Sequence, residues 1–108
     1  MTINLPKPID DYFRTDRARS GDITRCFTDN AIVKDESHTY QGLTAIKQWK
    51  MDSSKKYRYT SEPFNLEEKA GKTIVTSKLT GNFPGSPVNL NYIFSLEGDK
   101  IASLEITL

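Results

Sequence analysis

The sequence predicts a single α+β domain in which three helices from the N-terminal half pack on one face of a strongly curved, mainly antiparallel sheet. Two observations carry this prediction. In the first half of the chain, apolar residues recur at the spacing of one helix face, and after residue 57 they alternate with polar residues, as in half-buried strands. The 108 residues contain no repeat, low-complexity tract or linker, so we expect one domain over residues 1–108.

The first helix is expected to run from Pro8 to about Arg19. Proline suits the first turn of a helix, because its missing N–H would be unpaired there in any case. Ile9, Tyr12 and Phe13 follow i, i+3, i+4 spacing and therefore share one face. This face is expected to pack against the sheet.

A second, short helix is expected over Ile23–Phe27, with Asp22 as its N-cap. A strand over Ala31–Val33 then runs into an acidic pair that begins at Asp35. A tight return brings the chain back to Tyr40, so the segment forms a hairpin.

The third helix is expected to begin after Gly42, which breaks the preceding strand. Leu43, Ile46 and Trp49 recur at i, i+3 spacing and give this helix an apolar face. Basic residues gather on the helix and beside it. They form either a solvated surface or a site for an anion or an acidic partner; they are Lys47, Lys50, Lys55, Lys56 and Arg58.

Strands are expected to fill the remainder of the chain. Pro63 disfavours a central position in the first of them and predicts an edge or a bulge. Turns at residues 70–72 and 98–99 and a loop over residues 83–87 separate this strand from three more. In the two middle strands every second residue is expected to share a face, first Val75, Ser77 and Leu79, then Leu90, Tyr92, Phe94 and Leu96.

Composition excludes several classes of protein. With 15 basic and 14 acidic residues, the net charge of +1 gives no electrostatic reason to expect nucleic acid or a membrane surface as partner. The single cysteine, Cys26, is expected to be a buried, unreactive thiol in a reducing compartment. One cysteine and one histidine make a zinc site improbable, and no cofactor is expected. No signal peptide or membrane-spanning run is recognisable, so the cytoplasm is the expected location.

Two patterns follow one another in the stretch from Cys26 to Trp49. Phe-x-x-x-Ala-x-Val-x-Asp ends at Asp35, and Gly-x-x-Ala-Ile-x-x-Trp begins at Gly42. In this order they resemble the SnoaL-like, nuclear-transport-factor-2-like superfamily, which includes ketosteroid isomerases, polyketide cyclases and limonene epoxide hydrolases. The resemblance covers nearly the whole chain and implies a cone-shaped fold that encloses a pocket. The patterns are specific for the fold and say little about the reaction.

A curved sheet closed by helices leaves a cavity in which a small apolar molecule could bind. Each expected lining side chain would serve equally well as core packing, so the sequence leaves open whether space remains between them. Beside Tyr12, the expected ligand-binding side chains are Phe13, Trp49, Tyr57, Tyr59, Val75, Ser77, Leu79, Leu90, Tyr92 and Phe94.

Three residues are candidates for catalysis. The resemblance to ketosteroid isomerases implies that Asp35, at the cavity mouth, removes a proton next to a carbonyl; the alternative is that Asp35 caps the hairpin turn. Tyr12 matches the tyrosine of the first helix that donates a hydrogen bond to the developing oxyanion; the alternative is a packed ring with its hydroxyl on water. His38 could exchange a proton with Asp35 across the turn, although a hairpin histidine is more often exposed.

The resemblance to any one enzyme of the family is incomplete. The second oxyanion donor of ketosteroid isomerases falls at Leu90, and leucine cannot donate. The late-strand histidine and aspartate of polyketide cyclases, and the Asp-Arg-Asp triad of limonene epoxide hydrolase, are not recognisable. Two classes of function therefore stay open: a cofactor-free acid–base isomerase, cyclase, dehydratase or hydrolase, and a non-catalytic module that binds a ligand or a protein.

The outer face of the expected sheet predicts a homodimer. Its residues are small or uncharged for a fully solvated surface, and such a face commonly pairs across a two-fold axis. The residues concerned are Thr76, Thr80, Asn89, Asn91 and Ile93.

Overall fold

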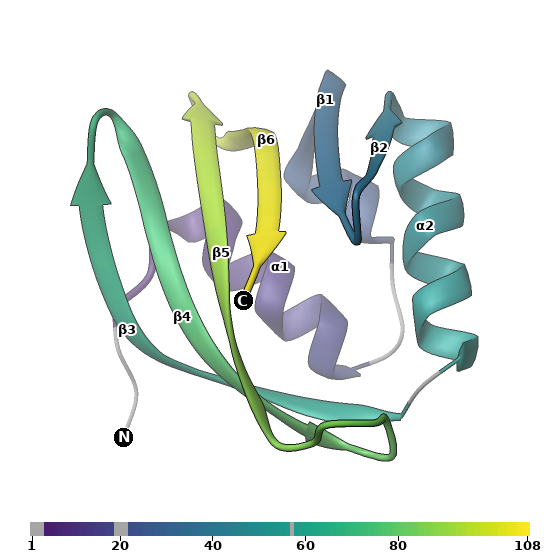
Figure 1. Ribbon diagram of the computed structural model, residues 1–108. Helices are drawn as coiled ribbons and strands as arrows, with labels where there is room; N and C mark the ends of the chain where they lie inside the picture. The colour runs from purple at the N-terminus through teal and green to yellow at the C-terminus, as the bar shows by residue number, and fades with distance from the viewer. Residues whose placement is uncertain (1–3, 19–21, 57) are drawn as a thin grey trace.

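The computed structural model describes residues 4–18, 22–56 and 58–108. This part of the chain contains two α-helices, one 3-10 turn and six strands (Figure 1). The helical elements are α1 (Lys7–Ala18), η1 (Ile23–Cys26) and α2 (Leu43–Lys56). The strands are β1 (Phe27–Asp35), β2 (His38–Gln41), β3 (Tyr59–Lys69), β4 (Lys72–Gly81), β5 (Val88–Glu97) and β6 (Lys100–Thr107).

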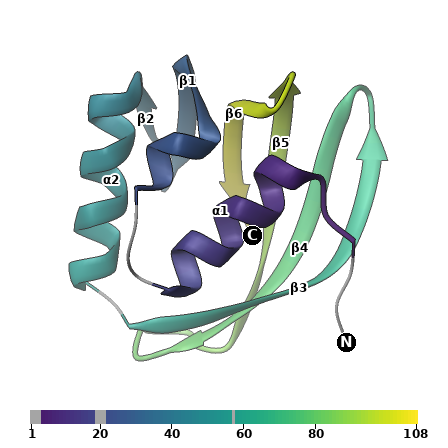
Figure 2. The ribbon, with the colours of Figure 1, turned by 180° about the vertical axis from the view of Figure 1, so that it is seen from behind.

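The six strands form one mixed sheet in the order β2-β1-β6-β5-β4-β3. All neighbouring strands are antiparallel except β1 and β6, which run parallel. The sheet curls strongly at β3 and β4 without closing on itself, and α1 lies across its concave face with α2 beside β1 and β2 (Figure 2). The predicted α+β class and the mainly antiparallel sheet are confirmed.

Two of the three predicted helices are the α-helices α1 and α2, and the remaining one is not an α-helix. The expected second helix is the short 3-10 turn η1, and Phe27 already has the extended backbone of β1, with φ −112° and ψ 152°. Asp22 caps η1 as predicted, because its Oδ1 accepts a hydrogen bond from the backbone N–H of Thr24 at 3.0 Å. The predicted end of the first helix at Arg19 lies outside the described residues.

Pro63 lies on the edge strand β3, as the sequence predicts. The β3–β4 register shifts between Pro63 and Asn65, which marks a bulge at the proline. Proline cannot donate a ladder hydrogen bond, so an edge position with a bulge is where it costs least. A bulge also bends its strand, and β3 is one of the strands at which the sheet curls (Figure 1).

The core lies between α1 and the inward faces of β4, β5 and β6. Ile9, Tyr12 and Phe13 are buried on the face of α1 that their spacing predicts. The ring of Phe13 packs edge-on against Tyr92 with centroids 5.0 Å apart, and the ring of Tyr12 packs edge-on against Phe94 at 5.8 Å. Edge-to-face pairs of this kind each contribute about 0.5–1.5 kcal/mol beyond their buried area.

The β1–β2 hairpin turns through two residues, Glu36 and Ser37, which both have positive φ, 51° and 66°. In the antiparallel register Asp35 stands opposite His38. The left-handed conformation is unfavourable for residues that have a Cβ atom. The turn therefore ends β1 with two residues outside the extended region of backbone conformation. The strand alternation therefore stops at Asp35.

Two further findings concern the predictions from composition. In the described part of the chain, no helix is long and apolar enough to cross a membrane. Cys26 is buried as predicted, and its burial raises the pKa of the thiol to about 11. The thiol is therefore almost entirely protonated near neutral pH and is a poor nucleophile.

Candidate functional site

A hollow of about 530 Å³ opens where α1, α2 and the concave face of the sheet meet. Side chains from both helices, from β3 to β6, from the end of β1 and from the β4–β5 loop line it, and most of this lining is apolar. A volume of this size suits a small molecule. Seven of the side chains that the sequence predicts for the site lie in this lining: Tyr12, Asp35, Trp49, Tyr59, Leu79, Leu90 and Tyr92.

Four predicted lining residues belong instead to the sealed core. Phe13, Val75, Ser77 and Phe94 are each at most 1% exposed and do not line the hollow. Val75, Ser77 and Phe94 point inward as the alternation predicts, and Phe13 packs on the buried face of α1, but all four are sealed from the hollow. The Ser77 hydroxyl is satisfied there by the hydroxyl of Ser61 at 2.7 Å. Tyr57, also predicted to bind ligand, lies outside the described residues.

His38 does not line the hollow. It is exposed, its Nδ1 lies 2.9 Å from the backbone oxygen of Glu36, and its ring stacks on Tyr40 at a centroid distance of 6.4 Å. It lines a second depression, formed by the β1–β2 turn and the end of β6, which shares Asp35 and Glu36 with the hollow. The structure therefore brings Asp35 and Tyr12 together in one site and leaves His38 outside it.

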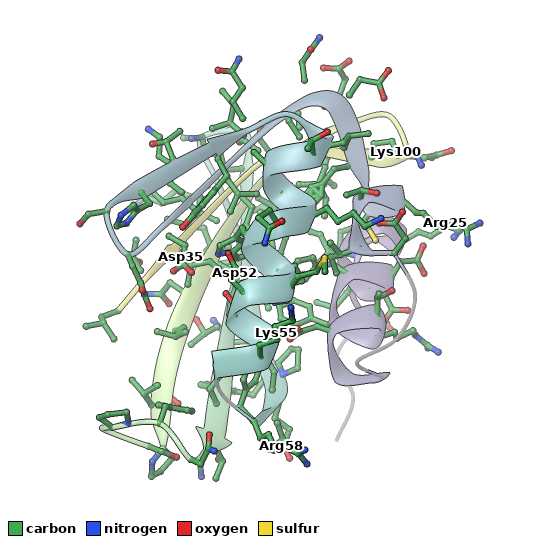
Figure 3. The ribbon with its side chains drawn as sticks, turned by 90° about the vertical axis from the view of Figure 1, so that its right-hand side faces the viewer. Arg25, Asp35, Asp52, Lys55, Arg58 and Lys100 are labelled. Carbon is green, nitrogen blue, oxygen red and sulfur yellow. The ribbon has the colours of Figure 1, made fainter. Side chains whose placement is uncertain are left out.

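The carboxylate of Asp35 faces α2 (Figure 3). Its Oδ2 accepts a hydrogen bond from Trp49 Nε1 at 3.0 Å. Among the described residues, no backbone N–H of the hairpin donates to this carboxylate. The geometry thus differs from that of a turn cap, in which the backbone N–H groups hold the side chain. Asp35 is partly buried and lines the hollow with its indole partner.

Tyr12 is 1% exposed, and its hydroxyl has no hydrogen-bond partner among the described residues. Every fully buried side-chain polar atom in the described part of the chain has a hydrogen-bond partner. Since the Tyr12 hydroxyl has none, it is not fully buried, and it faces the hollow that Tyr12 lines. Burial and the nearby carboxylate of Asp16 raise the pKa of Tyr12 well above its usual value. The phenol therefore stays protonated near neutral pH and can donate a hydrogen bond to a ligand.

An ion pair that the sequence analysis missed lies beside Tyr12. Lys50 Nζ is 2.8 Å from Asp16 Oδ1, and the two side chains are only 13% and 4% exposed. Tyr59 completes the group, because its hydroxyl accepts a hydrogen bond from Lys50 at 3.1 Å and donates one to Asp16 at 2.9 Å. The sequence left open whether Lys50 belongs to a solvated basic surface or to an anion site, and the structure places it in the lining of the hollow.

Glu36, the second residue of the acidic pair, is exposed and also lines the hollow, on the same side as Asp35. Its positive φ breaks the strand alternation, so the rule that neighbours point to opposite faces ends one residue earlier. The loop residues Phe83 to Gly85 and the C-terminal Leu108 complete the rim. No local sequence signal indicates their place, because it depends on how β4, β5 and β6 curl around the hollow.

The lining combines three chemical functions. Asp35 can accept a proton, Tyr12 can donate a hydrogen bond, and Lys50 supplies positive charge. Burial raises the pKa of Tyr92 far above its usual value, so this neighbour also stays a neutral phenol. The described residues include no cluster of three histidine, cysteine, aspartate or glutamate side chains that could hold a metal ion.

No protein-family model matches the sequence, and no curated protein matches it. Among solved structures, a Sinorhizobium meliloti protein provisionally assigned as a polyketide cyclase is 36% identical, with a TM-score of 0.90, over 95% of this chain and 95% of its own. A Catenulispora acidiphila protein with a ketosteroid isomerase-like fold, solved in complex with trimethylamine, is 12% identical with a TM-score of 0.80 over 97% of this chain and 87% of its own. SalBIII, an epoxide hydrolase/cyclase-like enzyme of pyran ring formation in salinomycin, is 22% identical with a TM-score of 0.76 over 92% and 85% of the two chains.

The two more distant likenesses show the fold alone. The likeness to the Sinorhizobium meliloti protein covers 95% of both chains, and its 36% identity is high enough to show a common family. This family agrees with the resemblance that the two patterns between Cys26 and Trp49 indicate. The chain therefore belongs to the SnoaL-like, nuclear-transport-factor-2-like superfamily.

Proposed function

We propose that the protein is a cofactor-independent acid–base enzyme that acts on a small, largely apolar carbonyl compound held in the hollow. The observation that carries the proposal is the presence of Asp35 and Tyr12 in one apolar lining. Isomerisation of an unsaturated ketone, aldol-type cyclisation and dehydration of a β-hydroxy ketone can all begin with the removal of a proton from carbon next to a carbonyl. This is the step that the site supports.

In the proposed step, the carboxylate of Asp35 takes a proton from the carbon next to the carbonyl. The electron pair of the C–H bond forms a carbon–carbon double bond, and the π pair of the carbonyl moves to its oxygen, which becomes an enolate oxyanion. The Tyr12 hydroxyl donates a hydrogen bond to this oxygen and stabilises the charge as it develops. Asp35 then returns the proton to the same carbon or to another one. The bond between Trp49 Nε1 and Asp35 orients the base.

One solved relative supports this reaction class. The Sinorhizobium meliloti protein, which is 36% identical, carries a provisional assignment as a polyketide cyclase. SalBIII, an epoxide hydrolase/cyclase-like enzyme, shares only the fold. The relatives do not agree on one reaction, which matches a fold whose sites vary independently of its architecture.

Deuterium exchange tests the proposal without knowledge of the natural substrate. We expect the protein to speed the exchange of the carbon-bound acidic protons of 2-tetralone for solvent deuterium, followed by proton NMR. The matched control is Asp29→Asn, which removes an exposed carboxylate of β1 outside the hollow and should leave the rate unchanged. A rate no higher than that given by the same concentration of acetate would exclude proton abstraction from this probe.

A non-catalytic binding module is the second candidate, and one observation favours it. Leu90 lines the hollow at the position where ketosteroid isomerases have a second oxyanion donor. The Trp49 indole lies in the lining and is the only tryptophan of the chain, so its fluorescence reports binding. Quenching by 2-tetralone without any deuterium exchange is the result expected of a binding module.

We further propose that the protein is a homodimer formed through the convex face of the sheet. Val75 and Tyr92 are buried, so their neighbours Ile74 and Ile93, which pair in the β4–β5 register, point outward. Both are half-buried and uncharged. Light scattering at micromolar concentration should give about twice the monomer mass of 12.3 kDa. Ile93→Arg should give monomers, whereas Thr44→Arg, on the exposed side of α2, should not; a wild-type mass of one chain would contradict the proposal.

A further inference from the structure

Among the described residues that line the hollow, Lys50 is the one basic side chain, and the proposed proton transfer does not use it. Its ammonium group is enclosed rather than solvated. The ring centroids of Trp49, Tyr12 and Tyr59 lie 4.9, 5.5 and 5.8 Å from Nζ. Aromatic faces attract a cation at such distances, and together with Asp16 they hold the group in one place.

The hydrogen bonds of Lys50 leave one donor for a ligand. An ammonium group has three N–H donors. One meets Asp16 at 2.8 Å and one meets the Tyr59 oxygen at 3.1 Å. No other described residue receives the third, and Lys50 lines the hollow. A ligand oxygen is the kind of group that would complete this set.

Trp49 contacts both Asp35 and Lys50. The indole Nε1 donates a hydrogen bond to Asp35, and Lys50 Nζ lies over the indole ring, 4.9 Å from its centroid. A molecule in the hollow therefore meets a carboxylate and an ammonium group that are held by the same indole. This combination suits a ligand that gives up a proton and gains negative charge.

We propose that Lys50 is a ligand-binding residue whose ammonium group holds a ligand oxygen that carries or develops negative charge, so that the hollow takes ionisable hydroxyl compounds such as phenols and the enolates of ketones. The enolate part rests on the function proposed above, whereas phenolate binding needs no turnover. Lys50 and Tyr12 together then provide the charge and the hydrogen bond that Leu90 cannot. The ion pair with Asp16 keeps the ammonium group in place when the hollow is empty.

The test uses 4-nitrophenol, whose phenolate absorbs visible light and whose neutral phenol does not. Equilibrium dialysis gives the amount bound, and the absorbance of the bound fraction gives its ratio of phenolate to phenol. The decisive variant is the double substitution Lys50→Met with Asp16→Asn. It removes both members of the ion pair, so no unpaired charge is left in the core, and the net charge of the protein is unchanged. Lys55→Met, which removes an exposed lysine of α2, is the matched control.

We expect the bound phenolate-to-phenol ratio to be about tenfold higher in the wild type than in the double variant. The control should match the wild type. Asp16→Asn alone should raise the ratio further, because the ammonium group keeps its charge and loses its partner; a purely structural role of Lys50 predicts no such rise. Equal ratios in the wild type and the double variant would overturn the proposal.

The same proteins separate this proposal from the proposed enzyme function. If the wild type exchanges 2-tetralone protons but binds 4-nitrophenol with the same phenolate-to-phenol ratio as the double variant, the role of Lys50 is excluded and that of Asp35 is kept. A ratio that depends on Lys50, without any exchange of 2-tetralone protons, would support Lys50 and remove the enzyme. Binding of neither probe would overturn both.

Discussion

Asp35→Asn should abolish proton abstraction in the hollow, with a loss of about 10²–10⁴-fold in the rate of 2-tetralone deuterium exchange. Asparagine keeps the shape of the side chain, and its amide oxygen can still accept the hydrogen bond from Trp49 Nε1. It cannot take a proton from carbon. We therefore expect the fold, the oligomeric state and ligand binding to persist, as thermal melting, light scattering and Trp49 fluorescence would show.

Two further variants control this prediction. Glu36→Gln removes the neighbouring carboxylate of the rim and should leave most of the rate. Tyr12→Phe removes only one donor to the oxyanion and should cost less than Asp35→Asn. Asp35 would be a structural cap instead of a base if Asp35→Asn lowered the free energy of unfolding by about 1 kcal/mol and still exchanged the probe at the normal rate.

Phe94→Ala should lower the free energy of unfolding by about 3–5 kcal/mol, as measured by urea denaturation. The ring of Phe94 is fully buried, packs edge-on against Tyr12 and Phe13, and stacks on Tyr92. Its removal leaves a cavity between α1 and the sheet. Domains of this size are stable by only about 5–15 kcal/mol, so this loss is a large fraction of the total.

The matched control for this prediction is Phe64→Ala. Phe64 lies on the edge strand β3 and is 50% exposed. Its truncation should change the free energy of unfolding by less than about 0.5 kcal/mol. Equal losses for the two phenylalanines would contradict the assignment of the core to the space beneath α1.

Local patterns predict most of this fold because they report burial directly. The alternation from Val75 to Leu79 identifies the inward face of β4, and Pro63 identifies an edge strand with a bulge. The short helix after Asp22 was predicted less well. A segment of four residues forms too few hydrogen bonds to distinguish an α-helix from a 3-10 turn by sequence.

The depth of a side chain within the site cannot be predicted in the same way. Ser77 and Leu79 face the same side of β4, yet only Leu79 lines the hollow. A period of two gives the face of a strand and not the position along it at which α1 stops covering the sheet. That position depends on the curl of the whole sheet, which no single stretch of sequence encodes.

The ion pair between Asp16 and Lys50 did have a sequence signal. Asp16 follows Tyr12 by four residues, and Lys50 follows Ile46 by four, so each charged residue stands on the apolar face of its helix. A single charged residue on an apolar helix face usually lies at the edge of the face with its charged group in water. Together, the two residues indicate a buried ion pair, because each supplies the opposite charge that the other needs.

The indole N–H resonance of Trp49 offers the most direct test of the claim that the hollow is a ligand site. The chain has one tryptophan, so a nitrogen–proton correlation spectrum contains a single indole peak, from the group that donates to Asp35. Titration with 2-tetralone should move this peak in a saturable way, together with the backbone amides of Asp35 and Leu90. An indole peak that stays in place at concentrations that saturate binding, while amides of the convex face such as Ile93 move, would contradict the account.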